Sequence, residues 1–198
     1  MINRFYEEKF PTLDMDQDYY LREQAIEDTE SFFQYYTDPE VARYILATNP
    51  KTIVEAGAEI HYCRNLFRYK RGIYWTLARK DNDRMIGAIG LYLNNQHHRG
   101  EICYDLSRHY WKKGIMTKAL QKIVDYAIHH IGVQRIEAIT LKENIPSITV
   151  LKKLGFEHEG TLKNFRYFNG KSFDIEMFAV TPEIFNAIQT HTQIAQIA

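Results

Sequence analysis

The chain has 198 residues, which is enough for one domain that buries its own hydrophobic core. Basic and acidic residues balance at 25 each, so the formal net charge at pH 7 is zero, which argues against a nucleic-acid-binding protein because such proteins usually carry a basic excess. No apolar run approaches ~20 residues, so we expect no membrane span. Residues 1–18 lack the apolar core of a signal peptide, and Cys63 and Cys103 make no disulfide framework, so we expect a cytoplasmic protein.

Apolar periodicity and turn residues predict the elements of the first half of the chain. Asp38 followed by Pro39 is typical of a helix start, and Thr52 with Glu55 forms a capping-box pattern. In chain order we expect an irregular lead-in at 1–18, a strand at 19–23, a helix at 27–36 with Phe32, Phe33 and Tyr36 inward, a short helix from Pro39, a longer helix after Thr52 with Ala56, Ile60, Cys63 and Phe67 inward, and a hairpin of 74–79 and 85–93.

The second half alternates strands and helices and ends in a hairpin, whose signal is Asn169-Gly170. We expect strand 99–106, helix 114–130, strand 134–142, helix 146–154 ending at Gly155, and paired strands 156–168 and 171–180. Hairpins early and βα crossovers late predict an α/β class (α+β mixed) with one mixed sheet. The domain is expected to span 19–182, with a helical or frayed tail at 183–198.

The stretch from Tyr110 to Lys118 is a short basic loop between a strand and a long amphipathic helix. Apolar residues after the loop keep the spacing of one helix face, at Met116, Ala119, Leu120, Ile123, Val124, Ala127, Ile128 and Ile131. The first turn of a helix offers free backbone N–H groups and a positive dipole end, and Gly114 lets the backbone approach a ligand closely. The loop therefore predicts a phosphate site, although many helices follow a glycine and bind nothing.

A second motif, Asn-Ile-Pro-Ser-Ile-Thr-Val-Leu-Lys-Lys-Leu-Gly-Phe, runs from Asn144 to Phe156. With the loop, at this separation, it resembles the GNAT superfamily of acyl-CoA-dependent N-acetyltransferases, and within it the branch that acetylates the N-terminal amine of ribosomal proteins. That branch typically has Glu-Ile-Gly-Tyr-x-Leu, then Tyr-Trp-Gly-Lys-Gly, then Asn-x-x-Ser-x-x-Val-Leu-x-Lys-Leu-Gly-Phe, then an Asn-Gly hairpin. The resemblance spans Leu21 to Val180.

Three positions depart from the family pattern. Cys103 stands where glycine is usual, Lys112 replaces the first loop glycine, and Trp111 takes the usual Arg/Gln position. The resemblance implies a central mixed, mostly antiparallel sheet of about seven strands, flanked by helices and splayed between strands 4 and 5.

The resemblance also implies acetyl-CoA as co-substrate. We expect no metal, because the two histidines of each adjacent pair point apart and the two cysteines are separated. The pyrophosphate of acetyl-CoA would lie on the loop N–H groups, and its pantetheine arm would insert like a missing strand between 104–106 and strand 134–142. Asn144 and Ser147 are further candidates, although both residues equally suit a helix start. The predicted cofactor-binding residues are Leu106, Lys112, Lys113, Gly114, Ile115, Met116, Thr117, Asn144 and Ser147.

The proton carriers are predicted to be Glu101 and Tyr104. The position that holds a tyrosine acid in some branches is Leu151 here, so Tyr104, Tyr167 or bulk water would take that role. Glu101 is the favoured base because it begins the strand that leads to the cofactor, and its alternative is a solvated edge carboxylate. Other candidates are Glu143, Asp174, Glu176 and a water relay.

The acceptor is expected to be a primary amine, and the resemblance favours a protein N-terminus. The alternatives are a small amine such as a polyamine, amino acid or aminoglycoside, and a CoA-binding sensor that does not catalyse. Aromatic residues expected near the acceptor, or in ordinary packing, are Tyr35, Tyr36, Tyr44, Phe165, Tyr167 and Phe168. We expect no nucleic acid, no membrane, and a monomer or homodimer.

Overall fold

The computed structural model describes residues 9–45 and 47–197, with side chains up to residue 190. These residues form one eight-stranded sheet in the order β1-β2-β3-β4-β5-β6-β8-β7, with helices on both faces. The strands are β1 (Leu13–Asp14), β2 (Tyr19–Glu23), β3 (Gly72–Arg79), β4 (Met85–Asn94), β5 (Arg99–Leu106), β6 (Arg135–Thr140), β7 (Glu157–Phe168) and β8 (Lys171–Val180). The helices are η1 (Ile26–Asp28), α2 (Thr29–Tyr36), α3 (Pro39–Ala42), α4 (Ile53–Arg68), η2 (Arg108–Tyr110), α5 (Ile115–Tyr126), η3 (Ala127–Ile131), α6 (Ile145–Lys153) and α7 (Pro182–Ile197).

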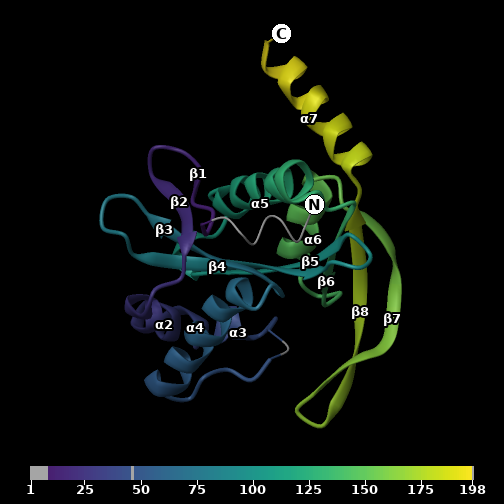
Figure 1. Ribbon diagram of the computed structural model, residues 1–198. Helices are drawn as coiled ribbons and strands as arrows, with labels where there is room; N and C mark the ends of the chain where they lie inside the picture. The colour runs from purple at the N-terminus through teal and green to yellow at the C-terminus, as the bar shows by residue number, and fades with distance from the viewer. Residues whose placement is uncertain (1–8, 46, 198) are drawn as a thin grey trace.

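The helices divide into two layers (Figure 1). Helices α5 and α6 cover one face of the sheet, and α2, α3 and α4 cover the other. Every strand pair is antiparallel except β5 with β6, which is parallel. The mixed, mostly antiparallel sheet expected from the sequence is therefore confirmed.

The larger core lies between the sheet and α5. The apolar stripe expected on this helix is buried, and the buried residues within α5 are Ile115, Met116, Ala119, Leu120, Ile123 and Val124. They pack with strand residues such as Ile102 and Leu106, which therefore face α5. A second cluster, under α2 and α4, contains Phe32, Tyr35, Val41, Ala56, Ile60, Met85 and Ala88.

Three sequence expectations need correction. The sheet has eight strands rather than about seven, because two residues of the lead-in, Leu13 and Asp14, pair with β2, so the splayed strands are β5 and β6. The 27–36 helix starts at Thr29, after a 3₁₀ turn. Its buried residues are Phe32 and Tyr35, whereas Phe33 and Tyr36 are only half-buried.

A buried carboxylate anchors the start of α2. Asp28 is 3% exposed and accepts hydrogen bonds from both terminal nitrogens of Arg22 at 2.8 Å, from the backbone N–H of Ala25 at 2.9 Å and from Thr76 Oγ1 at 2.9 Å. These donors come from β2, β3 and the turn before α2. The network therefore sets where α2 lies against the sheet, and with it the position of Tyr35.

The turn of the β7–β8 hairpin lies at the end of these strands away from α7 and extends past the other strands (Figure 1). The turn residues Asn169 and Gly170 have φ values of 47° and 76°, the left-handed values that a two-residue hairpin turn requires. The hairpin expected from Asn169-Gly170 is thus confirmed. None of the helices that the structure describes has the length and apolar character needed to cross a membrane.

Candidate functional site

Strands β5 and β6 pair at one end and separate at the other. Their pairing is limited to Arg99–Glu101 against Arg135–Glu137, although β5 continues to Leu106 and β6 to Thr140. At the paired end, Glu137 binds Arg99 at 2.7 Å and Arg135 at 2.8 Å. Beyond it, β5 stays bonded to β4 and β6 to β8. The edge of β5 at 102–106 that faces β6 is therefore open to an extended ligand.

The loop at the wide end of this gap is shaped by two left-handed residues. Lys112 has φ of 60° and Gly114 has φ of 74°, and α5 begins directly after Gly114 without a side-chain cap. Trp111 ties the loop to the strand, because its Nε1 donates to the Leu106 carbonyl at 2.8 Å. The N–H groups of the first turn of α5, which include those of Ile115, Met116 and Thr117, lack intrahelical acceptors. The loop and helix start thus form a place for an anion.

Lys112 occupies a conformation that costs an L-residue about 1–2 kcal/mol. We expect Lys112→Gly to raise the free energy of unfolding by about 1 kcal/mol, since this relief exceeds the added flexibility of the unfolded chain. Equilibrium urea unfolding measures the change. Lys113→Gly is the matched control, because Lys113 does not have a positive φ and should gain nothing. Equal effects of the two substitutions would contradict the explanation.

Three predicted site residues meet at the α6 side of the gap. Tyr104 Oη and Ser147 Oγ are 2.7 Å apart, and Asn144 Oδ1 accepts the Ser147 N–H at 3.3 Å. Asn144 therefore caps α6, which is the helix-start role that the sequence also predicted for this residue. Burial raises the pKa of Tyr104, and the bond to Ser147 opposes this effect only in part. The Tyr104 hydroxyl consequently stays protonated at neutral pH.

The opposite side of β5 carries Glu101, Cys103 and Asp105, which alternate with Tyr104 along the strand. Glu101 is the last β5 residue paired with β6, and its carboxylate is 40% exposed and lies 3.9 Å from Arg166. The two predicted proton carriers, Glu101 and Tyr104, thus lie on opposite faces of the strand.

Asp105 is a further candidate for the site, and no sequence motif indicated it. Its Oδ1 accepts a hydrogen bond of 2.6 Å from the hydroxyl of Tyr35 on α2. Burial raises the pKa of Asp105 to about 7, although the Tyr35 hydroxyl and the Ala88 backbone N–H act in the opposite direction. Such a carboxyl is poised to exchange protons near neutral pH.

Polar side chains surround Asp105 between β5 and helices α2 and α4, and we call this group the Asp105 cluster. Cys103 donates to Tyr74 Oη at 3.7 Å, and burial raises the pKa of the Cys103 thiol to about 12. The aromatic residues predicted near the acceptor lie in two places. Tyr35 and Tyr36 belong to the Asp105 cluster, while Phe165 and Tyr167 are exposed on β7.

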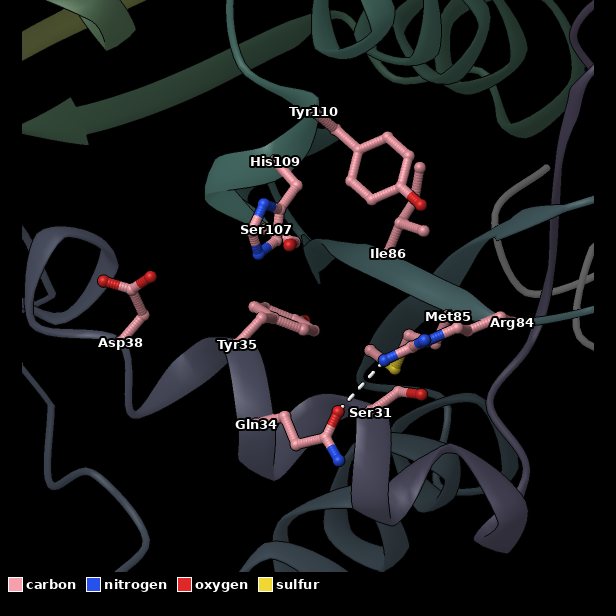
Figure 2. A pocket seen from close by; sticks show the side chains of 10 residues that line it. All are labelled: Ser31, Gln34, Tyr35, Asp38, Arg84, Met85, Ile86, Ser107, His109 and Tyr110. Atoms are coloured by element: carbon pink, nitrogen blue, oxygen red, sulfur yellow. Dashed lines mark hydrogen bonds between the residues drawn. The ribbon is translucent and has the colours of Figure 1, made fainter.

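A polar hollow of about 270 Å³ lies at the end of β5 and shares Tyr35 with the Asp105 cluster (Figure 2). Within the hollow Arg84 donates to Gln34 Oε1 at 3.0 Å. The side chain of Tyr35 lines the hollow, whereas its hydroxyl donates to Asp105. The lining residues are Ser31, Gln34, Tyr35, Asp38, Arg84, Met85, Ile86, Ser107, His109 and Tyr110.

Within the described residues, no three His, Cys, Asp or Glu side chains gather as a metal ion would require. The two histidine pairs of the sequence, His97-His98 and His129-His130, belong to no such group.

The known proteins that this chain resembles are acetyltransferases. A family model described as acetyltransferase (GNAT) domain matches residues 19–157. The uncharacterized N-acetyltransferase YoaA of Bacillus subtilis is 33% identical over 172 residues, which cover 86% of this chain and 97% of that protein.

Solved structures share the fold. The ribosomal-protein-S5-alanine acetyltransferase of Vibrio fischeri superposes with a TM-score of 0.76 at 22% identity, covering 88% of this chain and 98% of that one. RimJ of Mycobacterium smegmatis, in complex with CoA-disulfide, gives a TM-score of 0.78 at 20% identity, with 87% and 88% covered.

Proposed function

Because the chain belongs to the acetyltransferase (GNAT) family, we propose that it transfers an acetyl group from acetyl-CoA to a primary amine. The favoured acceptor is the N-terminal amine of a protein such as a ribosomal protein. The observation that carries the proposal is the separation of β5 from β6 beside the uncapped start of α5. A long ligand with amides along its arm and a diphosphate at one end fits that arrangement.

Each part of the site has a role in this proposal. Leu106 and its neighbours on the open edge of β5 would pair with the amides of the pantetheine arm. The N–H groups of residues 113–117 would hold the diphosphate, with the positive charges of Lys112 and Lys113 nearby. When bound, acetyl-CoA supplies the acetyl group as an activated thioester. A backbone N–H of the open edge would stabilise negative charge that develops on the carbonyl oxygen.

Protons would move on both faces of β5. Tyr104, which is protonated and held by Ser147, is the proposed donor to the leaving sulfur. Glu101 remains the sequence-based candidate for accepting the proton of the amine. Its exposure and its neighbour Arg166 make it an ordinary surface carboxylate in the structure. The role of Glu101 therefore stays a prediction.

The Vibrio fischeri neighbour is a ribosomal-protein-S5-alanine acetyltransferase, which supports a protein as acceptor, while its 22% identity to this chain shows a shared fold. The competing acceptors are a polyamine, an amino acid or an aminoglycoside. The hypothesis from another class is a CoA-binding sensor without turnover. The cytoplasmic location and the monomeric or homodimeric state also stay predictions.

The acceptor class is tested by release of free thiol from acetyl-CoA. We expect turnover with short peptides that begin with alanine, and slower turnover with spermidine and with free alanine. Mass spectrometry of the peptide should place the added acetyl group on its N-terminal nitrogen. Faster turnover with spermidine or free alanine would move the assignment to a small amine. Acetyl-CoA binding without turnover on any amine would favour the sensor.

A further inference from the structure

Asp105 differs from the buried carboxylates elsewhere in the protein. Asp28, Glu137 and Glu176 are 3–9% exposed, and each pairs with a basic side chain. Among the residues that the structure describes, no Lys, Arg or His forms an ion pair with Asp105. Its side chain instead accepts a hydrogen bond of 2.6 Å from the neutral hydroxyl of Tyr35.

The surroundings of Asp105 favour a cation. Burial desolvates the carboxylate, and a desolvated anion without a positive partner is costly. Glu59 raises the pKa of Asp105 further, because its negative charge disfavours a second one. The titratable groups that interact with the Asp105 cluster are acidic or neutral: Tyr35 and Tyr36 from α2, Glu59 and Cys63 from α4, Tyr74 from β3, Tyr92 from β4, and Cys103 from β5. The nearby basic side chains, Arg84 and His109, line the adjoining hollow, where Arg84 donates to Gln34.

The Asp105 carboxylate also lies close to the place where the amine must meet the acyl donor. Asp105 belongs to the part of β5 that has left β6, between Tyr104 and Leu106. Its side chain is on the α2/α4 face, while Tyr104 reaches α6 on the other face. A cation bound by Asp105 would therefore sit beside the open edge that we propose for the acyl donor.

We propose that Asp105 binds the acceptor as an ammonium ion and takes its proton, a step that rests on the proposed acetyl transfer. The N–H bond breaks, the proton forms an O–H bond on the carboxylate, and the electron pair stays on nitrogen. The nitrogen then bonds to the acetyl carbon as the C–S bond breaks, and the sulfur receives the proton of Tyr104. The bonded nitrogen releases its second proton, which water carries to the Tyr104 oxygen, so the products are a neutral amide and a thiol. Glu101 is thereby replaced as the acceptor of the proton.

The proton affinities match this role. An N-terminal ammonium has a pKa near ~8, so transfer to a carboxylate with a pKa of about 7 is disfavoured only about tenfold. Transfer to a carboxylate at the ordinary value of 3.8 would be disfavoured by roughly ten-thousandfold. Because the carboxylate is the active form, turnover should rise as the pH rises through about 7.

Asp105→Asn tests the proposal, because asparagine keeps the shape and can still accept the Tyr35 hydrogen bond. With the fastest acceptor of the peptide and amine panel, we expect kcat to fall about a hundredfold and the rise near pH 7 to disappear. Asp81→Asn, the same change at an exposed turn, should match the wild type. Near-wild-type turnover of Asp105→Asn, or loss of the pH 7 limb only in Glu101→Gln, would overturn the assignment.

A second measurement needs no turnover and separates this proposal from the proposed function. Protein labelled with ¹³C at aspartate carboxyl groups is titrated with and without methylammonium, and the Asp105 signal is the one absent from Asp105→Asn. We expect a midpoint near pH 7 that falls when methylammonium is added, since the bound cation stabilises the carboxylate. A midpoint that methylammonium leaves unchanged would overturn the binding of an ammonium ion. If this shift occurs but no amine is acetylated, the proposed function fails and the cation site stands.

Discussion

Gly114→Val is expected to raise the Kd for acetyl-CoA between about tenfold and a hundredfold while the fold survives. A valine at φ of 74° is strained by about 1–3 kcal/mol, and the loop relieves the strain by turning its N–H groups away from the anion. Neighbouring atoms do not contribute, because nothing lies within 4 Å of a Cβ built at this position. Isothermal titration calorimetry with acetyl-CoA measures the change.

Gly170→Val is the matched control for this experiment. Gly170 also has a left-handed φ of 76° and open space around its Cα, but it lies at the tip of the β7–β8 hairpin. The control should show a similar loss of stability with unchanged affinity for acetyl-CoA. If Gly114→Val bound acetyl-CoA as tightly as this control, the loop before α5 would not be the anion site.

Asp28→Ala is expected to lower the free energy of unfolding by about 3–5 kcal/mol. The substitution leaves the guanidinium of Arg22 without its buried partner and removes acceptors for Ala25 and Thr76. Since this network positions α2, and α2 carries Tyr35, the variant should also disturb the hydrogen bond from Tyr35 to Asp105. Equilibrium urea unfolding followed by far-UV circular dichroism gives the magnitude.

An exposed ion pair supplies the comparison for Asp28. Asp81 pairs with Arg79 at the β3–β4 turn, where water screens the two charges. Asp81→Ala should therefore leave the midpoint of urea unfolding close to that of the wild type. A midpoint for Asp28→Ala that equals the Asp81→Ala midpoint would show that the Asp28 network does not hold α2 in place.

Much of the fold could be predicted because local signals and burial agree. The strand 19–23 has the predicted bounds, and the apolar stripe that begins at Met116 lies in the core. The Asn169-Gly170 turn has its expected conformation because only a few residues tolerate a positive φ at such a tip. The two-residue strand Leu13–Asp14 gave no signal, since two residues show no periodicity.

The candidate site was predictable only in part. The loop from Lys112 to Thr117 could be located because a strand, a glycine and a helix follow one another in the sequence. The contact of Tyr104 with Ser147 depends on how α6 packs against β5, which no local pattern reports. Asp105 stands at the variable position of Glu-Ile-Gly-Tyr-x-Leu, and its partner Tyr35 comes from a distant helix. The raised pKa of Asp105 follows from burial by residues that are distant in the sequence, and composition and spacing do not report such burial.

The central claim is that the gap between β5 and β6 holds the arm of acetyl-CoA, and calorimetric titration of the wild-type protein tests it most directly. Acetyl-CoA and ATP share a nucleotide with phosphates, but only acetyl-CoA has an arm that can pair with the open edge of β5. We predict saturable binding of one acetyl-CoA per chain, with no binding of ATP at the same concentrations. Equal binding of the two ligands, or no binding of acetyl-CoA, would contradict the claim.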